Sequence, residues 1–98
     1  MSDPTFNAFL ISALQALSAR PLTNRKELAG WRLEANRLEE SFTPEQAGTV
    51  PHFVWHYLGD ADIRLRNSGY RADQERRLQQ LFRELGPGAH KPVPRRRP

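Results

Sequence analysis

Residues 4–20, PTFNAFLISALQALSAR, have the clearest helical pattern in this 98-residue chain. Apolar residues recur in this stretch at intervals of three and four, which is the spacing of one face of an α-helix. Pro4 suits the first turn of a helix capped by Ser2 or Asp3, and the helix should end before Pro21, because the residue before a proline avoids helical geometry. The stretch therefore predicts an amphipathic helix whose buried face consists of Phe6, Phe9, Leu10, Ala13, Leu14 and Leu17.

Two later segments have the same periodicity. The first begins at a capping pair, Asn24 and Glu27, and its apolar side consists of Leu28, Trp31, Ala35, Leu38 and Phe42. Gly30 interrupts this helix at a cost of about 1 kcal/mol relative to alanine, and we interpret it as the point where a neighbouring helix crosses closely. The other later segment is expected to form a helix from about Tyr70 to Leu85, and its inward side consists of Gln74, Leu78, Leu81, Phe82 and Leu85.

The segment between these two helices contains a capping box and then a third apolar stripe. The capping box predicts a short helical turn near residues 44–48, and its residues are Thr43, Pro44 and Gln46. Thr49 is expected to restart a longer helix over about 50–66, with Gly69 in the left-handed conformation as its C-terminal cap. The main stripe of that helix consists of Val50, Phe53, Val54, Tyr57, Leu58, Ala61 and Leu65.

These helices are joined by short connections, which favour antiparallel neighbours. No segment alternates polar and apolar residues over a useful length, so no sheet is expected. The predicted fold is all-α: a small four-helix bundle with an extra turn near residues 44–48. We expect residues 1–86 to form one helical domain and residues 87–98 to form a disordered, Pro/Arg-rich tail.

The net positive charge of the chain lies entirely in that tail. The chain has 15 Lys and Arg against 11 Asp and Glu, and the tail holds four of the basic residues, Lys91, Arg95, Arg96 and Arg97. Residues 1–86 are therefore neutral, and the high isoelectric point does not indicate a basic domain. The tail could neutralise about three or four phosphates, so weak binding to nucleic acid or another acidic partner is one hypothesis. A solubilising terminus is the simpler interpretation.

Composition also excludes several classes of protein. The absence of cysteine removes disulfides and thiolate metal sites, and it favours a reducing compartment. No apolar run is long enough to cross a bilayer, and the N-terminal segment lacks the basic start of a signal peptide. We expect a bacterial cytoplasmic protein with no cofactor, no membrane association and no small-molecule substrate.

The helix predicted over about 50–66 is apolar on a second side. That side holds His52, Trp55, His56, Gly59 and Ile63, where a surface helix normally carries charge. Three explanations are open. The helix can run through the middle of the bundle, the second side can bind a partner or another copy of the chain, or the histidines can carry chemistry.

The chemical explanation rests on the spacing of His52, His56 and Asp60. Intervals of four place the three side chains one turn apart on one helix face, as in helical metal sites, although the glutamate of a zinc-protease motif is missing. Metal-dependent or hydrolytic activity is therefore only an alternative. Asp60 and Asp62 are more simply interpreted as residues that end or bend the helix, or that pair with Arg64 and Arg66. The leading hypothesis is a non-enzymatic protein-binding or regulatory module, with self-association into a homodimer as one form of it. Its predicted partner surface is formed by His52, Trp55, His56, Gly59 and Ile63.

Overall fold

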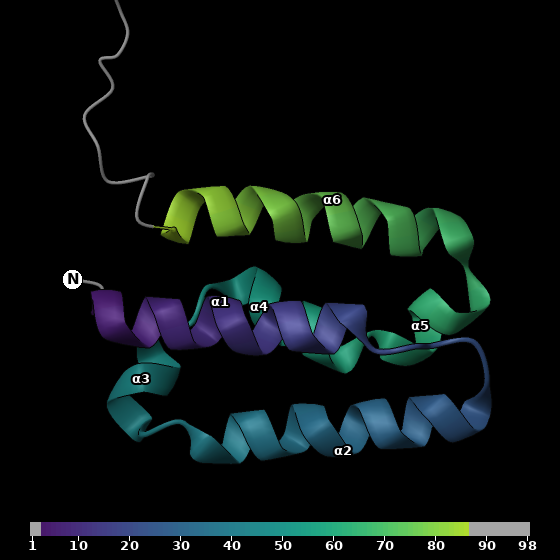
Figure 1. Cartoon of the computed structure of the whole chain (residues 1–98), viewed down its shortest axis with the longest axis horizontal. Helices are drawn as coiled ribbons and strands as arrows, with labels where there is room; N and C mark the ends of the chain where they lie inside the picture. Colours follow the sequence, from purple (N-terminus) through teal and green to yellow (C-terminus); the bar gives the residue numbers. More distant parts are fainter. Residues whose placement is uncertain (1–2, 87–98) are drawn as a thin grey trace, which may run out of the picture.

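The computed structural model describes residues 3–86, and within that range the chain is helical with no strand (Figure 1). The predicted all-α class is therefore confirmed. No helix in the described range is long and apolar enough to cross a membrane. The helices are α1 (Pro4–Ala19), α2 (Arg25–Ser41), α3 (Pro44–Thr49), α4 (His52–Gly59), α5 (Ala61–Arg66) and α6 (Ser68–Leu85).

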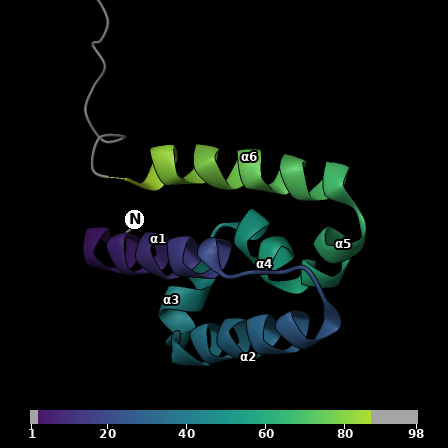
Figure 2. The same cartoon turned by 45° about the vertical axis from the view of Figure 1, so that its right-hand side comes forward.

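The helix α1 lies at the centre of the arrangement. It contacts α2 on one side and α6 on the other, and it runs antiparallel to both (Figure 1). The short helices α4 and α5 lie behind α1, as the turned view also shows (Figure 2). They close the core from that side, where α5 contacts both α2 and α6. The opposite side of α1 is covered by no other helix of the described residues.

The core lies where residues of α1, α2, α4, α5 and α6 meet, and it contains most of the predicted apolar residues. Leu10, Leu14 and Val54 are fully buried, and Trp31 is 1% exposed and donates a hydrogen bond from Nε1 to the carbonyl oxygen of Leu17 at 2.9 Å. Phe9 contradicts the prediction, because its side chain is 47% exposed. It lies at the edge of the α1 stripe, beside the groove between α1 and α2.

The helix starts confirm the capping signals read from the sequence. Asp3 accepts a hydrogen bond from the backbone N–H of Thr5, and Asn24 accepts one from that of Glu27. The capping box of α3 is complete, since Thr43 and Gln46 each bind the other's backbone N–H. Local side-chain chemistry therefore sets these boundaries.

The helix predicted over about 50–66 is two helices. The chain breaks at Asp60, whose backbone has φ −103° and ψ 19° and lies outside the helical region. The last residue of α4, Gly59, precedes this break, and α5 continues in a new direction from Ala61. A single apolar stripe does not reveal the break, because both halves bury residues of the same stripe.

Three further expectations about the helices are wrong. Thr49 ends α3 instead of starting a helix, and α4 begins after Pro51. Gly69 is not a C-terminal cap, because it lies in the first turn of α6, whose cap is Asn67. Gly30 marks no close helix crossing: among the described residues, the one atom within 4 Å of a Cβ added there is Nη2 of Arg20, at 3.4 Å.

Candidate functional site

The partner surface predicted on the helix over about 50–66 is divided by the break at Asp60. His52, His56 and Gly59 are exposed on α4, while Ile63 is half-buried on α5. Trp55 is half-buried and packs edge-on against Phe42, with 5.8 Å between ring centroids. The structure therefore brings the two histidines together and directs much of Trp55 toward the core. Neither complete burial nor a fully open apolar patch describes this side.

The histidine pair lacks the third ligand that the spacing suggested. The rings of His52 and His56 lie 4.7 Å apart between centroids, in an edge-to-face arrangement. The carboxylate of Asp60 instead accepts hydrogen bonds from the hydroxyl of Tyr70 and from Nε2 of Gln74. Within residues 3–86, no three His, Asp or Glu side chains are grouped to hold a metal ion. The predicted set of His52, His56 and Asp60 does not form.

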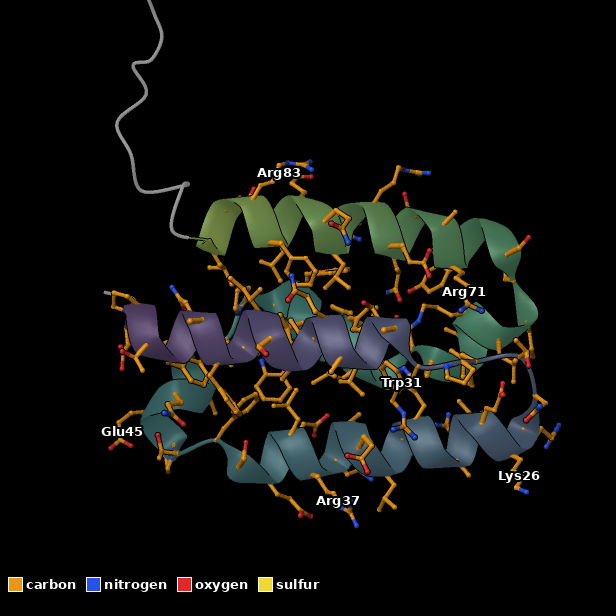
Figure 3. All side chains as sticks on the ribbon, viewed as in Figure 1. Lys26, Trp31, Arg37, Glu45, Arg71 and Arg83 are labelled. Carbon is orange, nitrogen blue, oxygen red and sulfur yellow. The ribbon has the colours of Figure 1, made fainter. Side chains whose placement is uncertain are left out.

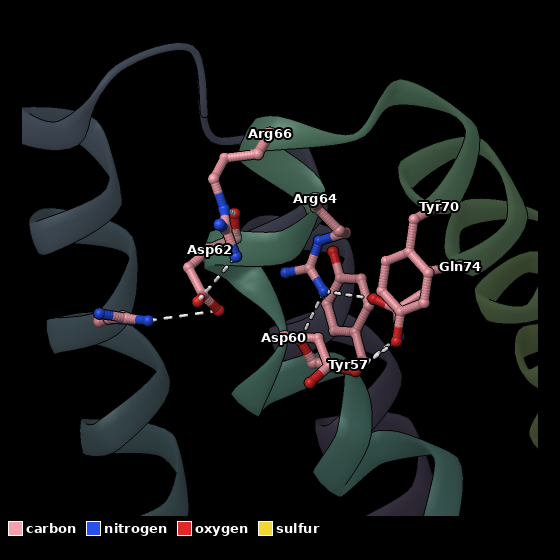
Figure 4. Close-up of polar contacts among 8 residues, drawn as sticks. Tyr57, Asp60, Asp62, Arg64, Arg66, Tyr70 and Gln74 are labelled. Atoms are coloured by element: carbon pink, nitrogen blue, oxygen red, sulfur yellow. Dashed lines mark hydrogen bonds and ion pairs between the residues drawn. The ribbon is translucent and has the colours of Figure 1, made fainter.

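A buried arginine is the main polar feature that the sequence did not reveal. Arg64 on α5 is 3% exposed, and its Nη1 donates hydrogen bonds of 2.6 Å to the carbonyl oxygen of Tyr57 and to Oε1 of Gln74 (Figure 4). Its Nη2 has no hydrogen-bond acceptor among the described residues. The guanidinium lies over two aromatic rings, 4.0 Å from that of Tyr57 and 4.8 Å from that of Trp31.

Hydrogen bonds through Gln74 link Arg64 to the carboxylate of Asp60. Gln74, which is 2% exposed, accepts from Arg64 with its oxygen and donates with its nitrogen to Asp60, at 3.3 Å, and to the Tyr70 hydroxyl, at 3.1 Å. One chain of hydrogen bonds therefore joins α4, α5 and α6 (Figure 4). A buried polar network of this kind stabilises a fold only when its members find partners.

Burial and hydrogen bonding shift the titration of this network. Removal from water lowers the pKa of Arg64 and raises the pKa of the Tyr57 hydroxyl. The hydrogen bond to Asp60 raises the pKa of Tyr70, because it holds the hydroxyl proton. At neutral pH both tyrosines are therefore protonated. Arg64 is charged, because a guanidinium keeps its proton in proteins. The network joins three helices and its guanidinium is closed off from solvent, so we interpret its role as structural.

A signal for this network was present in the sequence but was ambiguous. Gln74 falls on the inward stripe of α6, as predicted, and a polar residue on such a stripe needs a buried partner. Arg64 was expected to pair with one of the neighbouring aspartates. The structure confirms the pairing of Asp62 with Arg66, at 3.8 Å, and adds Arg32 of α2, at 3.4 Å. Arg64 instead binds Tyr57 and Gln74.

The uncovered side of α1 is the second unusual surface. The helix contains no Asp, Glu, Lys or Arg between its caps, although much of it faces solvent. We call its exposed residues after Pro4 the open face; they are Thr5, Ala8, Phe9, Ser12, Gln15, Ala16 and Ala19. Exposed helix surfaces normally carry charge, so an uncharged face of this length needs a reason.

A groove between α1 and α2 borders the open face. It has a volume of about 340 Å³, and Leu17 and Leu38 both line it. Phe9 lines the α1 side, and Arg37, paired with Glu34 at 2.9 Å, lines the α2 side. The arrangement offers a mostly apolar depression beside an uncharged ridge, and the charged residues Arg20, Glu34 and Arg37 also line it.

The structure does not describe the basic residues predicted to bind an acidic partner, which are Lys91, Arg95, Arg96 and Arg97.

Comparisons with protein-family models, with curated proteins and with solved structures found no significant match to this chain.

Proposed function

We propose that this protein is a non-enzymatic protein-binding module and that the open face of α1, with the groove beside it, forms its binding surface. The observation that carries the proposal is an exposed side on a helix of 16 residues that has no charged side chain. Water-exposed helices favour charge, whereas the centres of protein interfaces are depleted in charged residues and enriched in aromatic ones such as Phe9.

The small residues of the open face suit contact with another backbone. Ala8, Ser12 and Ala19 present short side chains, so a partner helix can approach closely; helix axes in contact are about 8–10 Å apart, depending on the side chains between them. The exposed ring of Phe9 stands next to a groove that an apolar side chain of the partner can fill. The partner we expect is therefore an apolar, uncharged protein surface.

The surface predicted on α4 supports the proposal less well. Trp55, which would have been its anchor, packs its edge against Phe42, and only His52, His56 and Gly59 remain exposed. Interface anchors are large side chains that enter a partner pocket. We therefore keep the class of function and move the binding surface from α4 to α1.

Photo-crosslinking in the source cells tests the proposal. Benzoylphenylalanine is placed singly at Ser12 on the open face, at His56 on α4, and at Arg83 on the solvent side of α6 (Figure 3). A covalent protein adduct is expected from position 12, and its mass identifies a second copy or a different protein. Position 83 is the matched exposed control and should give no adduct.

Two results contradict the proposal in different ways. Adducts from position 56 alone would return the binding surface to α4. Labelling that is equal at positions 12 and 83, or absent at all three, would remove the argument for a protein-binding module. Circular dichroism of each variant checks that the helices are retained.

A further inference from the structure

The outer side of α2 carries a second stripe that the core does not use. We call it the outer seam; its residues follow one another at intervals of three and four, and all five are exposed: Lys26, Ala29, Leu33, Asn36 and Glu40. This is the spacing of the contact positions in a two-helix coiled coil.

The outer seam faces away from the rest of the molecule. Trp31, Ala35 and Leu38 lie on the opposite side of the same helix and are buried. Lys26 points away from α1, whereas Trp31 points inward (Figure 3). The helix α2 is also at one edge of the layer, with α6 at the other edge (Figure 1). A second helix can therefore reach the outer seam without meeting any other element of the described chain.

The outer seam is complementary to itself when two copies run antiparallel. Leu33 lies at its midpoint and is 51% exposed, which makes it, with Phe9, one of two large hydrophobic side chains exposed in residues 3–86. Lys26 and Glu40 lie seven residues before and after it. In an antiparallel pair centred on Leu33, each Lys26 therefore meets Glu40 of the other copy, and the two leucines meet each other.

The charge distribution of α2 supports this arrangement. A helix is stabilised by acidic residues in its first turn and basic residues in its last turn, because of its dipole. The helix α2 begins with Arg25 and Lys26 and ends with Glu39 and Glu40, and no basic residue lies in its last turn. The acidic residue of its first turn, Glu27, accepts hydrogen bonds from Thr23 at the cap. The remaining charges, basic at the start of α2 and acidic at its end, interact unfavourably with the dipole of their own helix. Between two antiparallel copies the same charges attract each other.

The two remaining seam residues are compatible with this register. Ala29 is small, so it lets the two helices approach closely. Asn36 lies three residues after Leu33, and Ala29 lies four residues before it. In the antiparallel pair, Asn36 is therefore nearly opposite Ala29 of the other copy, with an offset of about one residue along the helix axis. A polar side chain at a contact position lowers the stability of a coiled coil, so Asn36 keeps this contact weak.

We infer that the chain forms an antiparallel homodimer through the outer seam of α2, with Leu33 on the two-fold axis and one Lys26–Glu40 ion pair on either side. A contact made by one helix of 17 residues, with a single large apolar side chain, is smaller than the roughly 800 Å² per partner of a standard interface. The dimer should therefore dissociate at micromolar concentrations. Salt weakens it, because the ion pairs lie at the two ends of the outer seam, where solvent reaches them.

A charge-exchange experiment tests the inference on the full chain. In the two-fold dimer, Lys26→Glu or Glu40→Lys replaces both ion pairs with pairs of like charge. Each substitution should therefore raise the dimer dissociation constant by about tenfold or more. An equimolar mixture of the two variants restores both ion pairs in a heterodimer. Sedimentation equilibrium should therefore find each variant monomeric and the mixture dimeric.

Neighbouring substitutions are the matched controls. Arg25→Glu and Glu39→Lys make the same charge changes one residue away, about 100° around the helix, and should leave the dimer intact. Leu33→Ala should weaken association without unfolding the chain, because the side chain is half exposed. Circular dichroism checks the fold of every variant.

Three outcomes overturn the inference. These are a wild-type chain that is monomeric up to millimolar concentration, a dimer that does not respond to Lys26→Glu or Glu40→Lys, and a mixture of these two variants that does not associate. None of them affects the proposed binding by α1, because the crosslinking position at Ser12 lies on a different helix.

Discussion

The two sides of α1 reverse the usual placement of charge. Behind it, the core holds a guanidinium, since Arg64 is 3% exposed and reaches Asp60 only through Gln74. In front of it, the open face is exposed and has no charged side chain. Burial alone therefore does not decide where charge is found in this protein. The buried charge has specific partners in three helices, and the uncharged face is covered by no other helix of residues 3–86.

The difference predicts different sensitivities to mutation. A buried polar network is costly to break because each remaining member loses its partner, whereas an exposed face contributes little to the stability of the isolated chain. Substitutions on the two sides of α1 and on α4 test this contrast.

Removing the buried charge should have the largest effect. Arg64→Ala leaves the carbonyl oxygen of Tyr57 and Oε1 of Gln74 buried without this donor, and it opens a cavity beside Trp31. We expect a loss of about 3–5 kcal/mol in the free energy of unfolding, measured by urea titration. Arg66→Ala is the control and should cost less than about 1 kcal/mol, because Arg66 is exposed and pairs with Asp62 only at the surface. Equal losses would show that Arg64 is not a special site.

The second prediction compares the two sides of α1 directly. Leu14→Ala removes a fully buried side chain and should destabilise the chain by about 2–5 kcal/mol. Ser12→Ala, two residues away on the open face, should change stability by less than about 0.5 kcal/mol. Thermal and urea unfolding at low protein concentration measure both. A large effect of Ser12→Ala would mean that the open face is covered within one chain.

The third prediction concerns alkaline pH. The pKa values of Tyr57 and Tyr70 are raised in the folded chain, so the unfolded chain releases these protons first. Their contribution to stability is complete below about pH 10, the unfolded value, and is lost as pH rises through the folded values. Urea titrations from about pH 8 to pH 11 should show this decline. In Tyr70→Phe the decline should be shallower, since only Tyr57 remains; an unchanged slope would contradict the role of the Asp60 hydrogen bond.

Apart from the control substitutions, the smallest effect is expected at Gly59, on the α4 side of the molecule. Among the described residues nothing lies within 4 Å of a Cβ added there, and the backbone of Gly59 is not left-handed. Gly59→Ala should therefore stabilise the chain by about 0.4–1 kcal/mol by reducing the freedom of the unfolded state. Dimer affinity, measured in parallel, should not change. A loss of affinity would restore Gly59 to the partner surface predicted from the sequence.

Local signals in the sequence predicted much of the secondary structure. Asp3, Asn24 and the capping box at Thr43 begin helices where they were expected, because a side-chain cap acts on backbone groups two or three residues away. The inward position of Gln74 was also predicted. Asp60 was interpreted as a residue that ends or bends a helix, but the helix was still expected to continue over about 50–66, because the apolar stripe runs through the break and no proline marks it.

The candidate site was much less predictable. The spacing of His52, His56 and Asp60 is compatible with one helix face, but Asp60 lies at the break and binds Tyr70 instead of joining the histidines. Trp55 was placed on a second apolar face, and Phe42 covers its edge from the end of α2. Phe9 was predicted to be core and is exposed, because α2 and α6 leave one side of α1 open.

The helical class, the caps and the inward stripes follow from the amino-acid sequence alone, because periodicity and capping act within a few residues. The packing of the helices sets which residues of a stripe are covered, which partner Arg64 finds, and which uncharged side of a helix stays exposed. Those properties depend on contacts between different helices, such as Trp31 with Leu17 or Arg64 with Gln74. No local spacing encodes the geometry of such contacts, since it is set when the whole core closes.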